Sequence, residues 1–176
     1  PFRNENIKLR IVIAKKLKDK WTVVEEFPYN NSEFSVGHPA INESGDTLFF
    51  ASDMPGGFGA TDLYMSIRKS GKWDNPVNLG PKINTAEKDE FPFITGNSYP
   101  GRYLVFASKG RNSKGGFDLF YTNLRDRKGV VYPFLEPINS TGDDFSMYLP
   151  ENVEYGYMTS NRPGTGNDDI YKLTFL

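Results

Sequence analysis

The sequence predicts an all-β fold made of repeated antiparallel sheets, from its composition and from an internal repeat. Of the 176 residues, 14 are Phe and 10 are Tyr, and 17 Gly and 12 Pro are spread along the chain. Aromatic runs that are separated by Gly, Pro, Asn and Asp are typical of short strands joined by turns. No stretch longer than a turn or two repeats apolar residues with the spacing of a helix, so we expect almost no helix.

The internal repeat has three copies of one strand-like segment. Residues 47–52 (TLFFAS) return as residues 103–108 (YLVFAS) and as residues 155–160 (YGYMTS). Each copy is followed by a Gly-rich loop and then by an acidic, an aliphatic and an aromatic residue. These acidic residues, spaced by 56 and then by 51 positions, are Asp62, Asp118 and Asp169. A period of this length indicates one supersecondary unit per copy, with neighbouring units stacked on one another.

Each repeat contains four short strands. In residues 32–84 we place them at about residues 37–41, 47–52, 62–68 and 72–79. The strand at 47–52 is apolar on both faces, which predicts that its sheet lies between two others. The link at residues 42–46 (NESGD) has the chemistry of a tight hairpin, because Gly45 adopts a positive φ at no steric cost. Four-stranded sheets that repeat every ~40–50 residues and pack face to face are the blades of a β-propeller.

The repeats do not add up to a whole propeller. Two of them are complete, one supplies three strands, and the N-terminal part supplies only two. These blades and partial blades span residues 7–31, 32–84, 85–139 and 140–176. Because propellers have about four to eight blades, we treat residues 1–176 as one region of a larger propeller, with five or six blades. The chain starts with Pro rather than Met, which also leads us to expect a longer polypeptide.

Composition excludes several kinds of function. Lys and Arg total 21 and Asp and Glu total 22, so the formal net charge is −1. This balance argues against a dedicated nucleic-acid binder, because neutralising phosphates needs a basic surplus. The absence of Cys removes thiol catalysis and Cys-ligated metals, and the single histidine, His38, excludes a site with two imidazoles. No apolar run reaches the ~18 residues of a membrane span. We therefore expect no cofactor, no metal and no direct membrane span.

Short segments of the repeat carry a resemblance to a known family. Residues 38–46 (HPAINESGD), 56–59 (GGFG) and 62–66 (DLYMS) resemble the WD40-like, TolB-type propeller repeat. The continuation at residues 72–84 (KWDNPVNLGPKIN) is similar to a narrower group, the propellers of Bacteroidetes OmpA-family proteins. That group includes the peptidoglycan-associated lipoprotein of the type IX secretion machinery. The peptidoglycan-binding OmpA-like domain itself is absent from the chain, so peptidoglycan binding is not carried over to these residues.

The resemblance implies an exported protein of the periplasm that is associated with the outer membrane through other parts of its chain. We therefore expect a protein-binding or scaffolding module without catalytic activity, whose partners are proteins of the cell envelope.

The binding residues are expected on one face of the propeller. Strand direction alternates within a blade, so the loop between the second and third strands emerges on the same face as the link between blades. These are the longest loops of the chain, and binding residues usually sit on such loops. Aromatic residues, Met and Arg are enriched at protein interfaces. The predicted binding residues are Met54, Phe58, Arg111 and Arg162. The alternative is that these loops are long only because the Gly–Asp turn needs the length.

The repeated aspartates admit two interpretations. Asp62, Asp118 and Asp169 could each be a calcium ligand, but calcium takes about six to eight oxygens and each loop offers one or two carboxylates. Repetition in every unit favours a structural role, in which each carboxylate accepts N–H bonds from its own loop. We therefore interpret them as structural turn residues.

The rival function is a carbohydrate-active propeller hydrolase that uses carboxylates on the channel face. Such enzymes need a pair of carboxylates roughly 5–9.5 Å apart in one cleft. The candidates are Glu87, Asp89 and Glu90, or Asp143 and Asp144. The same residues are also ordinary components of polar turns. His38 precedes Pro39 on a predicted innermost strand, and no Gly-x-Ser-x-Gly segment supplies a nucleophile for it, so we expect it to be a strand or channel residue.

Overall fold

The computed structural model describes residues 7–96, 102–126, 128–151, 154–164 and 166–174. Over these residues the chain forms strands β1 to β14 and no helix, which confirms the predicted all-β fold. Accordingly, no helix in the described segments is long and apolar enough to cross a membrane. The strands form four sheets that follow one another along the chain, and neighbouring strands within each sheet are antiparallel.

The four sheets contain the following strands. The first is a hairpin of β1 (Val12–Leu17) and β2 (Lys20–Glu26). The second contains β3 (Val36–Ile41), β4 (Thr47–Ser52), β5 (Asp62–Lys69), β6 (Lys72–Trp73) and β7 (Val77–Asn78). The third contains β8 (Asp89–Ile94), β9 (Tyr103–Ser108), β10 (Asp118–Asn123) and β11 (Val131–Pro133). The fourth contains β12 (Asp144–Tyr148), β13 (Tyr155–Ser160) and β14 (Asp169–Thr174).

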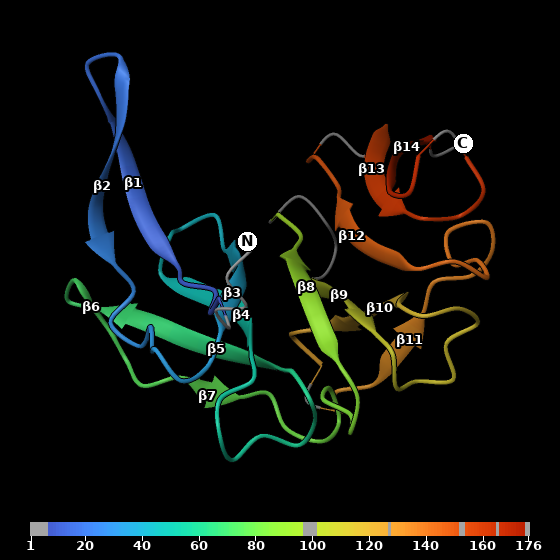
Figure 1. The fold of residues 1–176 in the computed structure, drawn as a ribbon, viewed down its shortest axis with the longest axis horizontal. Coiled ribbons are helices and arrows are strands. Elements are labelled where there is room, and N and C mark those ends of the chain that lie inside the picture. The colour runs from blue at the N-terminus through green and yellow to red at the C-terminus, as the bar shows by residue number, and fades with distance from the viewer. Residues whose placement is uncertain (1–6, 97–101, 127, 152–153, 165, 175–176) are drawn as a thin grey trace, which may run out of the picture.

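Successive sheets pack through their first strands. Strand β3 contacts β8, and β8 contacts β12, so these first strands form the inner edge of the arrangement, as they do in propeller blades. Figure 1 shows the sheets in order, from the β1–β2 hairpin (blue) through the second and third sheets to β12–β14 (red). The chain therefore forms part of a β-propeller.

Three apolar cores lie between successive sheets. Six apolar side chains of the repeated second and third strands, which we predict to lie between sheets, are no more than 2% exposed. They are Phe49, Phe50, Leu63, Val105, Phe106 and Leu119. Burying each of these side chains contributes roughly 1.5–3 kcal/mol, so packing between sheets is a main source of stability.

The outer part of the second sheet differs from the prediction. The sequence predicts one strand over residues 72–79, whereas the structure has two short strands, β6 and β7, which both pair with β5. Between them, Pro76 has no N–H to donate and interrupts the ladder. Both backbone groups of Asp74 form hydrogen bonds with β5: its N–H donates to Ile67 O (2.7 Å) and its carbonyl accepts from Ser66 Oγ (2.6 Å).

In each of the first three sheets, an Asn that follows the last strand bonds to the backbone of a residue near the start of the neighbouring strand. The Asn side chains are partly or fully buried. The amide oxygen accepts the backbone N–H of an aliphatic residue, and the amide nitrogen donates to the carbonyl of the same residue, at 2.8–3.0 Å. We call this arrangement the Asn clamp. The three pairs are Asn30 with Ile11, Asn84 with Leu63, and Asn139 with Leu119. The clamp at Ile11 supports the expectation that residues 7–31 supply the last two strands of a blade, which stays a prediction.

Candidate binding face

The long loops and the links between sheets lie together on one face, as the alternation of strand direction predicts. We call it the loop face; its loops and links are residues 53–61, 79–88, 109–117, 134–143 and 161–164. Backbone hydrogen bonds of 3.0 Å join each loop to a neighbouring link: Ala60 N to Glu87 O, Lys109 N to Lys88 O, and Asn161 N to Asp143 O. Because each loop is anchored at its base, the face is a defined surface rather than a set of independent loops.

The repeated aspartates close the turns of this face. Asp62 is buried and accepts from the N–H groups of Phe58 (2.5 Å) and Gly59 (2.9 Å) in its own loop. Asp118 accepts from Lys114 N (2.5 Å), and Asp169 accepts from Gly166 N (3.1 Å). Burial raises the pKa of Asp118. These contacts are those of turn-closing groups, and no cluster of three metal-ligating side chains occurs within the described ranges.

Two of the candidate catalytic carboxylates are fully buried. Asp89 accepts from both the N–H and the hydroxyl of Thr85, at 2.6 and 2.8 Å, and Asp144 makes the same pair of bonds with Ser140. Burial raises the pKa of Asp89 above its usual value. Each of these carboxylates caps the link that precedes its strand, so neither is presented to a cleft.

The other three carboxylates do not form a pair either. Glu87 is exposed on its link. Asp143 accepts from the Phe117 N–H (2.6 Å) and from the side-chain amide of Asn161 (3.0 Å), so it is part of the loop structure. Glu90 lines a recess that is described below. The structure therefore does not bring two free members of the predicted sets into one cleft.

The two predicted binding arginines are engaged with the protein itself. Arg162 donates to Pro137 O (2.6 Å), Ile138 O (2.5 Å) and Asp144 Oδ1 (2.6 Å). Arg111 donates in the same way to the carbonyls of Lys82 (2.5 Å) and Ile83 (2.7 Å). Burial lowers the pKa of Arg111, with the nearby carboxylate Asp89 acting in the opposite direction. Both guanidinium groups tie a loop to the link beside it.

The remaining two predicted binding residues differ in exposure. Met54 is partly buried and packs against the core between the first and second sheets. Phe58 is 52% exposed on its loop. Of the four predicted residues, Phe58 is thus the one whose side chain is presented openly, and a role in binding stays a prediction for all four.

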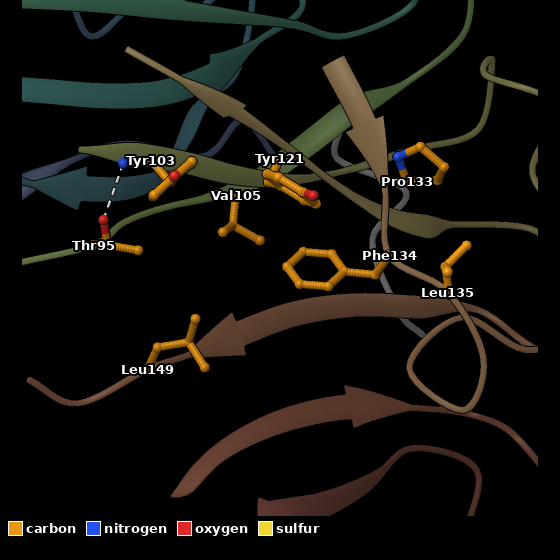
Figure 2. A pocket seen from close by; sticks show the side chains of 8 residues that line it. All are labelled: Thr95, Tyr103, Val105, Tyr121, Pro133, Phe134, Leu135 and Leu149. Atoms are coloured by element: carbon orange, nitrogen blue, oxygen red, sulfur yellow. Dashed lines mark hydrogen bonds between the residues drawn. The ribbon is translucent and has the colours of Figure 1, made fainter. Parts of the chain in front are cut away.

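A largely apolar hollow lies between the third and fourth sheets and has a volume of about 300 Å³. Figure 2 shows Val105, Tyr121 and Phe134 on one side of it and Leu149, which follows β12, on the other. A similar hollow between the second and third sheets is lined in part by Leu124. The residue equivalent to Leu124 in the last repeat is Phe175, which lies outside the described residues. Both hollows belong to the packing between sheets, and neither is a separate binding site.

A smaller recess of about 190 Å³ opens at the inner edge of the loop face, between the second and third sheets. It is lined by polar side chains that include Asp53, Lys88 and Glu90, and by His38. His38 lies on the innermost strand β3, as predicted, with φ of 49°, and its ring stacks on Phe91 at 4.1 Å between centroids. Burial lowers the pKa of His38, with Glu90 acting in the opposite direction. Sequence reasoning did not single out Asp53 as a site residue, because the other two repeats have Lys109 and Asn161 at its position.

Comparisons with known proteins bear on the fold of the chain. No known family model matches the chain, and no curated protein matches it. Among solved structures, a thermostable family-43 glycoside hydrolase matches with a TM-score of 0.54 and 16% identity over 96% of this chain. The chain spans 64% of the length of that hydrolase chain. A prolyl endopeptidase matches with a TM-score of 0.48 and 14% identity, over 95% of this chain and 25% of the other. The likeness to the hydrolase supports the assignment of a partial propeller.

The prediction that the chain is not an enzyme is wrong, because the hydrolase match shows that an enzyme has this fold over almost the whole length of the chain. The propeller therefore gives no ground for excluding catalysis. At 16% identity the likeness concerns the fold alone, and the hydrolase's activity is not transferred by it.

Proposed function

We propose that the chain is the protein-binding part of an exported cell-envelope protein and that its partner docks on the loop face. The observation that carries the proposal is the anchored loop face, with exposed side chains held on a rigid β scaffold. Phe58 is 52% exposed, and Glu87, Lys88 and Lys109 are exposed in the same set of loops and links. An aromatic side chain among polar neighbours is the usual composition of a protein interface.

The cellular setting of the proposal rests on the sequence resemblance. The segments at residues 38–46 and 72–84 are similar to propellers of Bacteroidetes OmpA-family proteins, which include a type IX secretion lipoprotein. On this basis we place the protein in the periplasm, with an outer-membrane assembly as the source of its partner.

The carbohydrate-active hydrolase is less well supported by the predicted carboxylates. Asp89 and Asp144 are buried in link caps and Asp143 is bonded within the loops, so these residues do not supply an accessible acid and base. The geometry of the loop face therefore favours binding of a macromolecule over hydrolysis by this set of residues.

A capture experiment with one variant and one control tests the proposal. The immobilised chain is incubated with a Bacteroidetes cell-envelope extract, and retained proteins are identified by mass spectrometry. We expect Phe58→Ser to lose most of the captured partner while its melting temperature is unchanged. The control is Val77→Ser, which alters a 58%-exposed apolar side chain on β7, away from the loop face. Equal loss with the control, or no protein retained above empty beads, would contradict the proposal.

A further inference from the structure

The recess between the second and third sheets has a mixed polar lining. Its walls come from residues around the starts of β3, β5 and β8 and the end of β4, and from Leu9, which precedes β1. The residues that matter for its chemistry are Ser35, His38, Asp53, Thr61, Lys88 and Glu90. Its volume of about 190 Å³ equals that of about six water molecules at ~30 Å³ each. This is room for one small ring and its substituents, and too little for a longer chain.

The recess exists because three residues depart from the repeat. Strand registers place His38 and Thr61 at the positions that Phe91 and Phe117 occupy one repeat later. Glu90, which follows Asp89, corresponds in sequence to Phe145, which follows the equivalent Asp144. At that later position the three Phe rings pack on one another, with centroids 5.7 Å apart for Phe91–Phe117 and 5.2 Å apart for Phe91–Phe145. In a repeat protein, shared residues maintain the scaffold, so an exchange of three aromatic rings for three polar side chains indicates a local task.

The recess contains charges of both signs, and two of them are available. Asp53 accepts the Ser35 N–H at 2.5 Å and pairs with Lys8 at 3.3 Å. The side chains of Lys88 and Glu90 have no hydrogen bond or ion pair with another described residue. A purely anionic or cationic ligand would therefore meet a like charge as well as an opposite one.

His38 is held in place at a backbone cost. His38 (φ 49°) and Phe91 (φ 52°) occupy equivalent bulges of β3 and β8 in the left-handed region, which bulky residues rarely adopt. The Nδ1 atom of His38 is buried without a hydrogen-bond partner among the described residues. Burial lowers the pKa of the imidazole, so the ring is neutral at pH 7. A neutral imidazole both donates and accepts hydrogen bonds, and its strained position keeps it at the recess.

We propose that this recess binds a neutral, polyhydroxylated ligand, namely one sugar residue. Sugar hydroxyls donate to the carboxylate of Glu90 and accept from the ammonium group of Lys88, so they satisfy groups of both signs at once. The volume fits one ring. The site lies at the inner edge of the loop face and shares Lys88 with it, but Phe58 does not line it. The inference goes beyond the function proposed above, because it concerns a small ligand and not the protein partner.

The test is an NMR titration of the ¹⁵N-labelled chain with neutral methyl glycosides. The probes are the methyl glycosides of glucose, galactose, xylose and N-acetylglucosamine. Each is added up to about 50 mM, because a single-ring ligand is expected to bind with a dissociation constant of ~1 mM or weaker. We expect at least one glycoside to shift the amide signals of Gly37, Asp53, Thr61 and Glu90 in a saturable manner.

Three variants connect the shifts to the recess. Glu90→Gln and Lys88→Met should each weaken binding by about tenfold, the effect of losing one charge-assisted hydrogen bond. Thr61→Phe installs the residue that the repeat has at position 117 and should abolish binding by filling the space. Glu87→Gln is the matched control, because Glu87 is exposed and does not line the recess. Each variant is first checked for a native amide spectrum, so that a failure to fold is recognised.

Several outcomes would overturn the proposal. Absence of saturable shifts with every glycoside would do so, and so would equal weakening by Glu87→Gln. Inorganic phosphate and arginine methyl ester are titrated in parallel as charged probes. If either charged probe moves the recess amides and no glycoside does, the recess takes a charged ligand instead. Loss of partner capture in Phe58→Ser leaves this result unaffected, so the two proposals fail independently.

Discussion

At the scale of single residues, Arg162 shows that a side chain suited to an interface can be required by the fold. Its guanidinium group bridges the Pro137 and Ile138 carbonyls and the fully buried carboxylate of Asp144. The Arg162 side chain itself is only 19% exposed. Reversing its charge, and that of Arg111, would therefore test the stability of the loop face and not the docking of a partner.

We predict that Arg162→Met lowers the free energy of unfolding by about 3 kcal/mol, because it leaves a buried carboxylate without its cation. Urea denaturation at pH 7 measures the change. Arg10→Met is the control: Arg10 pairs with Glu26 where both side chains are more than half exposed, and the expected loss is below about 1 kcal/mol. Similar losses for both variants would show that the Asp144 pair is not special.

Residue types alone gave part of the candidate site. The repeated Gly–Asp pattern predicted where Asp62 and its equivalents sit, because a turn-closing carboxylate depends on local spacing. The recess beside His38 could not be predicted in the same way. Its shape depends on a bulge in β3 and on which side chains face each other across two sheets, and neither is encoded in a local pattern.

At the scale of elements, the Asn clamp takes the place of a strand pairing. Asn84 satisfies both backbone groups of Leu63, a residue that is 0% exposed, and also donates to Asn78 Oδ1 at 2.8 Å. Without that amide, the buried Leu63 N–H would have no partner, whereas the Leu63 carbonyl would keep its bond from the Leu79 N–H (3.0 Å). A single Asn side chain therefore fixes each link between sheets to the sheet that precedes it in the chain.

We predict that Asn84→Ala costs about 2 kcal/mol, since one unsatisfied buried backbone N–H costs roughly 1–3 kcal/mol. Hydrogen exchange should show faster exchange at the Leu63 amide, and urea denaturation should show the loss of stability. Asn75→Ala is the control, because Asn75 is exposed between β6 and β7. We expect it to change neither the exchange rate of the Leu63 amide nor the stability. An unchanged Leu63 exchange rate in the Asn84 variant would show that water replaces the clamp.

Most elements could be predicted from the sequence, and the exceptions have physical reasons. Strands such as β4 and β9 carry continuous apolar runs, which mark them without any knowledge of their neighbours. The split into β6 and β7 follows from Pro76, whose effect on a predicted run was not weighed. None of the Asn clamps was predicted from the sequence. The segment that ends at Asn30, FPYN, also lacks the Gly or Glu and the Ile that precede Asn84 and Asn139.

At the scale of the whole molecule, the two end sheets expose positions that are buried elsewhere. Ile170 on β14 is 76% exposed, whereas the equivalent Leu119 on β10 is 0% exposed. Trp21 on β2 is 73% exposed. Trp73, its equivalent one repeat later in the matching segments KDKW and SGKW, is 7% exposed. Apolar sheet faces and open strand edges of this kind favour association with another sheet.

We therefore predict that the 176-residue chain associates in solution in a concentration-dependent manner. Light scattering coupled to size-exclusion chromatography should show an average mass that rises with loading concentration. Trp21→Lys with Ile170→Lys should shift the protein towards monomer, whereas Glu43→Lys on an exposed turn should not. A single monomeric species with a concentration-independent melting temperature would contradict the prediction.

The spacing of the Asn clamp has a consequence for how such proteins evolve. Its two partners lie 19, 21 and 20 residues apart in the three copies, so each clamp is contained within one repeat. A tandem duplication of one repeat length in the gene would copy the whole fastening together with the strands that it holds. A propeller built in this way can gain or lose a blade in a single genetic event, because no new long-range contact has to arise first.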